Sequence, residues 1–125
     1  TIGVGVPAQV RDLHAAATTA APGVPLRWHF HNTRNTGYAN ALTAAELAGS
    51  TPVALDSSSG GIGGCPFAPN ATGNIATEDL LYLLHRSGFE TGVDVAALLP
   101  LADRLGELLG HQVSGQLARA GLFPG

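Results

Sequence analysis

The sequence predicts an α/β fold built on parallel strands. Two short apolar segments, residues 26–31 and 51–56, begin 25 residues apart and have the length and composition of strands. A stretch of helical character, residues 35–49, lies between them. A strand, a helix and a second strand at this spacing form a β-α-β unit, in which the two strands run parallel. At 125 residues the chain is long enough for one domain.

Four helices are predicted from apolar positions that recur every three or four residues. They cover residues 8–21, 35–49, 77–86 and 94–109. Thr77 and Asp94 are suitable N-cap residues, because their side-chain oxygens can accept a hydrogen bond from the first turn. Gly88 and Gly110 stand where helices commonly end.

The first predicted strand ends in His29-Phe30-His31. Side chains alternate along a strand, so His29 and His31 point the same way, about 6–7 Å apart. Two neutral imidazoles placed like this can share one divalent metal ion. A strand that buries one hydrogen-bonded histidine is the alternative interpretation. Asp56 ends the second strand, and sites in such sheets lie beyond the carboxyl ends of the strands.

Residues 57–76 form the most unusual stretch, rich in glycine and holding Cys65, the only cysteine. A loop of this length is usually functional or disordered, and its apolar residues at defined places favour a functional loop. A cysteine between glycines and a proline can act as acid, base or nucleophile. A small buried apolar side chain is the alternative for Cys65. Glu78 and Asp79 follow, and a helix N-terminus alone would explain this acidic pair.

Composition excludes several classes of function. A net charge of −3 and the lack of a basic patch argue against a nucleic-acid partner. No apolar run reaches the roughly 18 residues of a membrane span, and no signal-peptide pattern opens the chain. A single cysteine excludes an internal disulfide and fits a cytoplasmic location. Methionine is absent, so we expect a processed or truncated piece.

Taken in order, His29-Phe30-His31-Asn32-Thr33, Asp56-Ser57-Ser58 and the glycine-rich stretch around Cys65 resemble the 3-hydroxy-3-methylglutaryl-CoA lyase family. The Gly-Gly-Cys-Pro loop is the specific signature, whereas His-x-His alone is shared with a wider group that includes isopropylmalate synthase. The resemblance runs from residue 1 almost to the end of the chain. The matching segments are His29-Phe30-His31-Asn32-Thr33, Asp56-Ser57-Ser58, Gly60-Gly61-Ile62-Gly63-Gly64-Cys65-Pro66-Phe67-Ala68 and Ala71-Thr72-Gly73-Asn74-Ile75-Ala76-Thr77-Glu78-Asp79-Leu80.

The resemblance implies a (β/α)₈ barrel. The chain looks like the C-terminal part of that barrel, about strands 6–8 and the helices that follow, so residues 1–125 would be a single partial domain. The first five strands, with an Arg-Asp-Gly motif that the family carries on its first strand, are absent from this sequence. The complete enzyme is expected to be a homodimer.

The resemblance also implies roles for individual residues. His29, His31 and Asn74 match the ligands of a divalent metal ion, Mg²⁺ or Mn²⁺. Cys65 matches a cysteine that transfers a proton at the leaving acetyl-CoA carbanion, and Glu78 matches an acidic residue near the site, so both are predicted to be catalytic.

Two positions depart from the family pattern. Asn32 stands where an aspartate is usual and Arg34 replaces a more usual tyrosine. Because of these two departures, the resemblance leaves the exact substrate open.

The implied substrate is an acyl-CoA thioester, 3-hydroxy-3-methylglutaryl-CoA, and the products are acetyl-CoA and acetoacetate. A base takes the proton of the tertiary hydroxyl, a metal ion binds that oxygen and a carboxylate, and a thiol protonates the enolate. A related 3-hydroxy-3-alkylglutaryl-CoA or another aldol-type substrate is the alternative within the same class. A non-catalytic fragment is the alternative from a different class, because without five strands the sheet has open edges.

Overall fold

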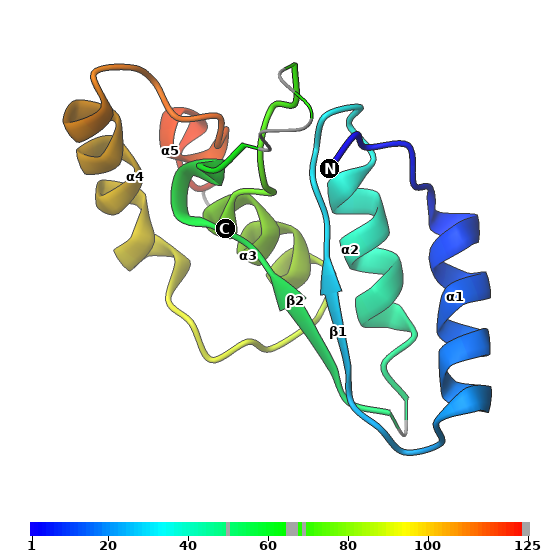
Figure 1. Ribbon diagram of the computed structural model, residues 1–125. Helices are drawn as coiled ribbons and strands as arrows, with labels where there is room; N and C mark the ends of the chain where they lie inside the picture. The colour runs from blue at the N-terminus through cyan, green and yellow to red at the C-terminus, as the bar shows by residue number, and fades with distance from the viewer. Residues whose placement is uncertain (50, 65–67, 69, 124–125) are drawn as a thin grey trace.

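The computed structural model describes residues 1–49, 51–64, 68 and 70–123. The strand–helix–strand unit predicted from the sequence is confirmed by β1, α2 and β2. None of the helices in these ranges is long and apolar enough to cross a membrane. In chain order the elements are α1 (Pro7–Ala20), β1 (Leu26–His29), α2 (Gly37–Glu46), β2 (Val53–Asp56), the 3₁₀ turn η1 (Ser59–Gly61), α3 (Thr77–Arg86), α4 (Val95–Leu109) and α5 (Leu117–Ala120), as Figure 1 shows.

The sheet pairs β1 with β2 in parallel, with Leu26 opposite Val53 and His29 opposite Asp56. Within the described residues these are its only two strands. In Figure 1 the two strands lie side by side, and α2, which contacts β2, lies between the sheet and α1. Because the two strands are parallel, their carboxyl ends lie next to each other at the same end of the sheet.

The helices cover one face of this sheet. Apolar side chains from α2, α3 and the segment before α3 form the core, and Phe30 and Leu55 pack against it from the strands. Trp28 points the same way as Phe30 and stacks on its ring, with centroids 5.8 Å apart. The core residues are Ala41, Ala45, Ile75, Leu80 and Leu84.

The opposite face carries polar side chains. Arg27 and His29 alternate with Leu26 and Trp28 along β1, and both are exposed. Asp56 lies on this face too, since it contacts Arg27. We call this side the open face. In a (β/α)₈ barrel the face away from the helices lines the interior of the barrel.

Helix ends follow local chemistry. The Asp94 side chain accepts a hydrogen bond from the Ala96 N–H at 2.9 Å, and Gly110 ends α4 in a left-handed conformation with φ of 70°. Glu78 and Asp79 occupy the first turn of α3, where the helix dipole favours negative charge. The expected cap is one residue off, because Thr77 is the first residue of α3 and Ala76 precedes it.

The predicted bounds differ from the observed ones at two places that have a structural cause. The first strand ends at His29 rather than at residue 31, because the backbone of His31 pairs with Asn74 instead of with β2. The helix predicted over 35–49 is shortened to α2, since Asn35 has a positive φ of 60° and forms a turn before it. The structure also contains α5, for which the sequence pattern predicts no element.

Candidate metal centre

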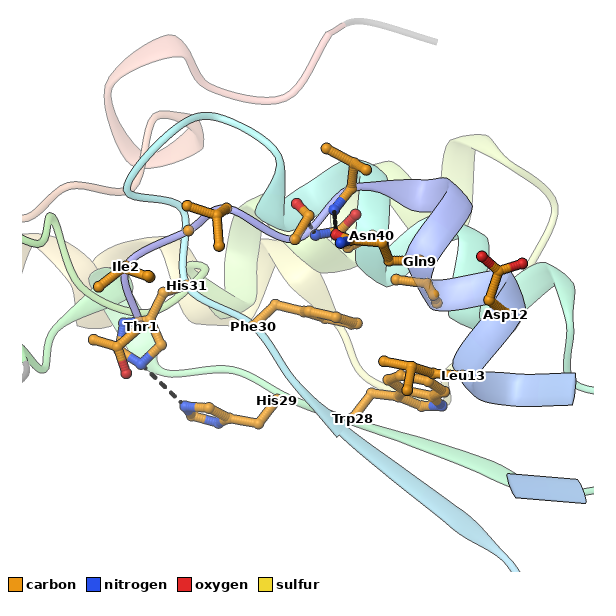
Figure 2. A pocket seen from close by; sticks show the side chains of 15 residues that line it. Thr1, Ile2, Gln9, Asp12, Leu13, Trp28, His29, Phe30, His31 and Asn40 are labelled. Atoms are coloured by element: carbon orange, nitrogen blue, oxygen red, sulfur yellow. Dashed lines mark hydrogen bonds between the residues drawn. The ribbon is translucent and has the colours of Figure 1, made fainter. Parts of the chain in front are cut away.

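His29 and His31 lie at the carboxyl end of β1 with their rings facing each other (Figure 2). Their Nε2 atoms are 3.2 Å apart, and the ring planes are inclined by 71°. Two nitrogens that each bind one ion at about 2.1 Å, at angles from octahedral to tetrahedral, lie about 3.0–3.4 Å apart. The separation therefore fits a shared ion, and without an ion it equally fits an N–H···N hydrogen bond between the rings.

The two rings have different surroundings. His31 is buried, with 9% of its surface exposed, whereas 53% of the His29 side chain is exposed. Burial lowers the pKa of the His31 imidazole, and the adjacent His29 acts in the same direction. A lowered pKa keeps His31 neutral, which is the form that binds a metal ion.

Asn74 is brought next to this pair by the long loop. Its backbone forms an isolated antiparallel bridge with His31, and its Nδ2 donates a hydrogen bond to the Ile62 carbonyl at 3.1 Å. Since the amide nitrogen is used in this way, the amide oxygen remains for a ligand. Among the described residues, no three of the types His, Cys, Asp and Glu gather as a metal site. The amide oxygen of Asn74, whose backbone pairs with His31, is the candidate third donor.

Glycines let the two arms of the loop approach each other closely. Gly73 has φ of 99°, and a Cβ there would lie 2.5 Å from the Gly63 carbonyl oxygen. The arms are also joined near the two ends of the loop, where the Ser58 N–H donates to the Ile75 carbonyl at 3.1 Å. Cys65, predicted to be catalytic, lies outside the described residues.

Glu78 is buried beneath the start of the same loop. Only 1% of its surface is exposed, and both carboxylate oxygens accept from the Gly60 N–H, at 3.1 and 3.0 Å. Gly115 packs against this carboxylate so closely that a Cβ there would lie 2.3 Å from Oε1. The structure thus places Glu78 as a support for η1.

Asp79 has a role that the sequence did not reveal. Its carboxylate accepts from the backbone N–H groups of Gln116 and Leu117 at the start of α5, at distances of 2.7–3.0 Å. The Tyr38 hydroxyl donates to it at 3.0 Å and accepts from the Ala76 N–H. Burial raises the pKa of Tyr38, which keeps this hydroxyl protonated. Asp79 therefore ties α5 to α3 and α2.

The two positions that depart from the family pattern hold the turn after His31. The Asn32 side-chain oxygen accepts from the Gly37 N–H at 3.1 Å, so it satisfies the first N–H group of α2, which the N-cap residue Thr36 leaves without a side-chain partner. Arg34 donates to the Ile2 carbonyl, which ties the turn to the N-terminal segment. Through these hydrogen bonds, both residues fix the turn that follows the candidate ligand His31.

Asp56 is a second residue without a role assigned from the sequence. Its Oδ1 accepts from Arg27 Nε at 2.6 Å, and its Oδ2 lies 3.5 Å from His29 Nδ1. The parallel register, with His29 opposite Asp56, is the signal that identifies this contact.

A pocket of about 530 Å³ lies beside the histidines, between the N-terminal segment, α1 and β1 (Figure 2). Trp28 and Phe30 line it together with His29 and His31, and no residue of β2 does. The pocket therefore follows the edge of β1 that β2 does not cover, where a barrel has its next strand.

Comparison with known proteins decides the family. The sequence model of the HMGL-like family matches residues 1–105. The chain belongs to the HMGL-like family. It is 45% identical over 121 residues to (R)-citramalyl-CoA lyase of Chloroflexus aurantiacus, covering 97% of this chain and 37% of that protein. It is 40% identical over 120 residues to mitochondrial hydroxymethylglutaryl-CoA lyase of Mus musculus, covering 96% and 36%.

A solved structure gives the same result for the fold. The HMG-CoA lyase from Acinetobacter baumannii, in complex with coenzyme A and 3-methylmalate, matches this HMGL-like chain with a TM-score of 0.84 and 42% identity. The match covers 98% of this chain and 40% of that one. The predicted family and the predicted part of a (β/α)₈ barrel are therefore confirmed. The chain spans a little over a third of the length of the curated relatives that it matches.

Proposed function

We propose that this chain supplies the metal-binding part of a lyase that cleaves 3-hydroxy-3-methylglutaryl-CoA to acetyl-CoA and acetoacetate. The activity requires the complete barrel, in which the chain is joined by the remaining strands. The observation that carries the proposal is the pair of imidazole Nε2 atoms 3.2 Å apart at the carboxyl end of β1. Family membership and the relatives named as hydroxymethylglutaryl-CoA lyases support it.

A second candidate substrate is (R)-citramalyl-CoA, because the relative named for that thioester is 45% identical to this chain. Both thioesters carry a hydroxyl and a methyl group on C3, and both release acetyl-CoA when the C2–C3 bond breaks. They differ in the fourth group on C3, a carboxymethyl group in one and a carboxylate in the other. The choice between them thus depends on where the site holds that carboxylate.

In the proposed reaction His29, His31 and Asn74 hold a Mg²⁺ or Mn²⁺ ion. Such an ion, when bound, polarises substrate oxygens and lowers the pKa of the tertiary hydroxyl. The hydroxyl loses its proton to a base, the C2–C3 bond breaks, and its electron pair passes to C2. Cys65 donates the proton that C2 gains, while the oxygen on C3 becomes the ketone of the second product.

Glu78 acts in this proposal through the backbone. It fixes the Gly60 N–H, and Cys65 follows Gly60 by five residues. Since its carboxylate is buried against the protein, Glu78 positions the start of the glycine-rich segment and does not itself touch the substrate.

The test is cleavage by the complete barrel after its metal has been removed with EDTA. We expect acetyl-CoA to form only when Mg²⁺ or Mn²⁺ is restored, and the ratio of kcat/KM for the two thioesters then identifies the substrate. A metal-loaded enzyme that releases acetyl-CoA from neither thioester would contradict the proposal.

A further inference from the structure

We infer that Asp56 is a positioning residue for the metal centre, which orients the His29 ring through Nδ1 while Arg27 holds its carboxylate in place. The inference rests on the proposed function, because it treats His29 as a metal ligand. It concerns a residue to which the sequence motifs assign no role. The test below separates its failure from that of the metal site.

The strand register brings these three side chains together. His29 and Asp56 are direct partners across the parallel pair, and Arg27 stands two residues before His29 on the same face. One carboxylate oxygen of Asp56 lies 2.6 Å from Arg27 Nε, and the other lies 3.5 Å from His29 Nδ1. The carboxylate thus spans the two residues.

The two nitrogens of His29 consequently face different partners. Nδ1 faces the Asp56 carboxylate and Nε2 faces Nε2 of His31 at 3.2 Å. A neutral imidazole carries its proton on one nitrogen and a lone pair on the other. A carboxylate beside Nδ1 favours the proton there, which leaves the lone pair on Nε2 directed at the ion.

His29 needs such a partner more than His31 does. His31 is held by its surroundings, with 9% of its surface exposed, whereas 53% of the His29 side chain is exposed. An exposed imidazole can rotate between several orientations. Fixing it in the one orientation that binds the ion costs conformational entropy, which weakens metal binding. At 3.5 Å the contact is longer than a hydrogen bond, so we expect it to shorten when an ion binds Nε2.

A simpler role for Asp56 than orienting His29 is to neutralise the charge of Arg27 on the open face. The two roles predict different behaviour of His29. If Asp56 only neutralises Arg27, then the tautomer of His29 and the affinity for metal do not depend on the carboxylate.

The experiment uses the complete barrel and two measurements, Mn²⁺ affinity by titration calorimetry and the His29 tautomer by ¹⁵N NMR on metal-free protein. Asp56→Ala should weaken Mn²⁺ binding by about 10- to 100-fold, the usual effect of losing a carboxylate behind a histidine ligand. Asp56→Asn, which keeps a neutral acceptor, should recover part of the affinity. Asp103→Asn removes an exposed charge on α4 and should change neither measurement.

The tautomer keeps the inference testable if a variant does not fold. Wild-type His29 protonated mainly on Nδ1 supports it, and wild-type His29 protonated mainly on Nε2 overturns it. Unchanged Mn²⁺ affinity in Asp56→Ala, with His31→Ala defective, also overturns it while the metal site stands. If wild-type protein fails to bind Mn²⁺ but Asp56→Ala shifts the His29 tautomer, Asp56 orients the ring without serving a metal centre, and both the inference and the proposed function fail.

Discussion

The two faces of the β1–β2 sheet differ in how complete they are. The covered face packs Phe30 and Leu55 against a core of small and aliphatic side chains from α2 and α3. The open face instead presents Arg27, His29 and Asp56, a cation, an imidazole and a carboxylate. In the proposed function the same two strands contribute stability on one side and chemistry on the other. Substitutions should therefore separate into those that change unfolding and those that change metal binding or turnover.

The largest effect is expected from taking residues 1–125 without the rest of a barrel. The edge of β1 away from β2 borders a pocket and has no strand beside it among the described residues. The strands that would lie next to this edge and enclose the open face of the sheet are present only in a complete barrel. We expect this piece to aggregate or to unfold without a sharp transition in a calorimetric melt. A cooperative and reversible melt of the monomeric piece would mean that the covered face is sufficient for folding.

Turnover should respond most strongly to Cys65→Ser. If the thiol donates the proton to C2, kcat of the complete barrel should fall by roughly 10²- to 10⁴-fold, the usual range for a positioned acid or base. Mn²⁺ affinity, KM and the melting temperature should stay nearly normal. A Cys65→Ser enzyme with near-normal kcat would show that the thiol serves packing or nothing.

The covered face should respond in stability alone. Leu80 is 3% exposed within the core, so Leu80→Ala in the complete barrel should lower the free energy of unfolding by about 2–5 kcal/mol. Leu101 on α4 is 50% exposed, and Leu101→Ala should change it by less than about 0.5 kcal/mol. Denaturant titrations measure both, and Mn²⁺ affinity should be the same in the two variants. A loss of metal affinity in Leu80→Ala would show that the two faces are not separable.

The support that Glu78 gives to η1 should also be measurable as stability. Glu78→Ala leaves the buried Gly60 N–H without its acceptor, which should cost about 1–3 kcal/mol of unfolding free energy. Glu78→Gln keeps one acceptor oxygen and should cost less. As a matched control, Glu107 pairs with Arg104 on the surface, and Glu107→Ala should have almost no effect. Equal denaturation midpoints for Glu78→Ala and Glu107→Ala would refute the support role.

Local features of this fold were predictable from the sequence because they depend on neighbouring residues. Short apolar segments identified β1 and β2, helical periodicity identified the main helices, and Asp94 and Gly110 marked the ends of α4. The short α5 was missed because Asp79, about 37 residues earlier, supplies its first hydrogen bonds. A four-residue helix held by a distant carboxylate has no pattern of its own.

The candidate site likewise has a part that nearby residues predict and a part that they do not. Adjacent histidines on one strand face follow from the two-residue repeat of a strand, so the pairing of His29 and His31 was predictable. The approach of Asn74 depends on glycines that let two loop arms meet, and the contact of Asp56 depends on strand register. Neither depends on nearby sequence, and only the resemblance to a family indicated Asn74.

The most direct test of the central claim, that the open face holds a divalent ion, is Mn²⁺ binding to the complete barrel by titration calorimetry. His31→Ala removes the buried imidazole and should weaken the affinity at least about tenfold, since a ligand is lost. His85→Ala, at the end of α3, removes an exposed histidine and should leave the affinity unchanged. Equal affinities of wild type, His31→Ala and His85→Ala would contradict the metal centre.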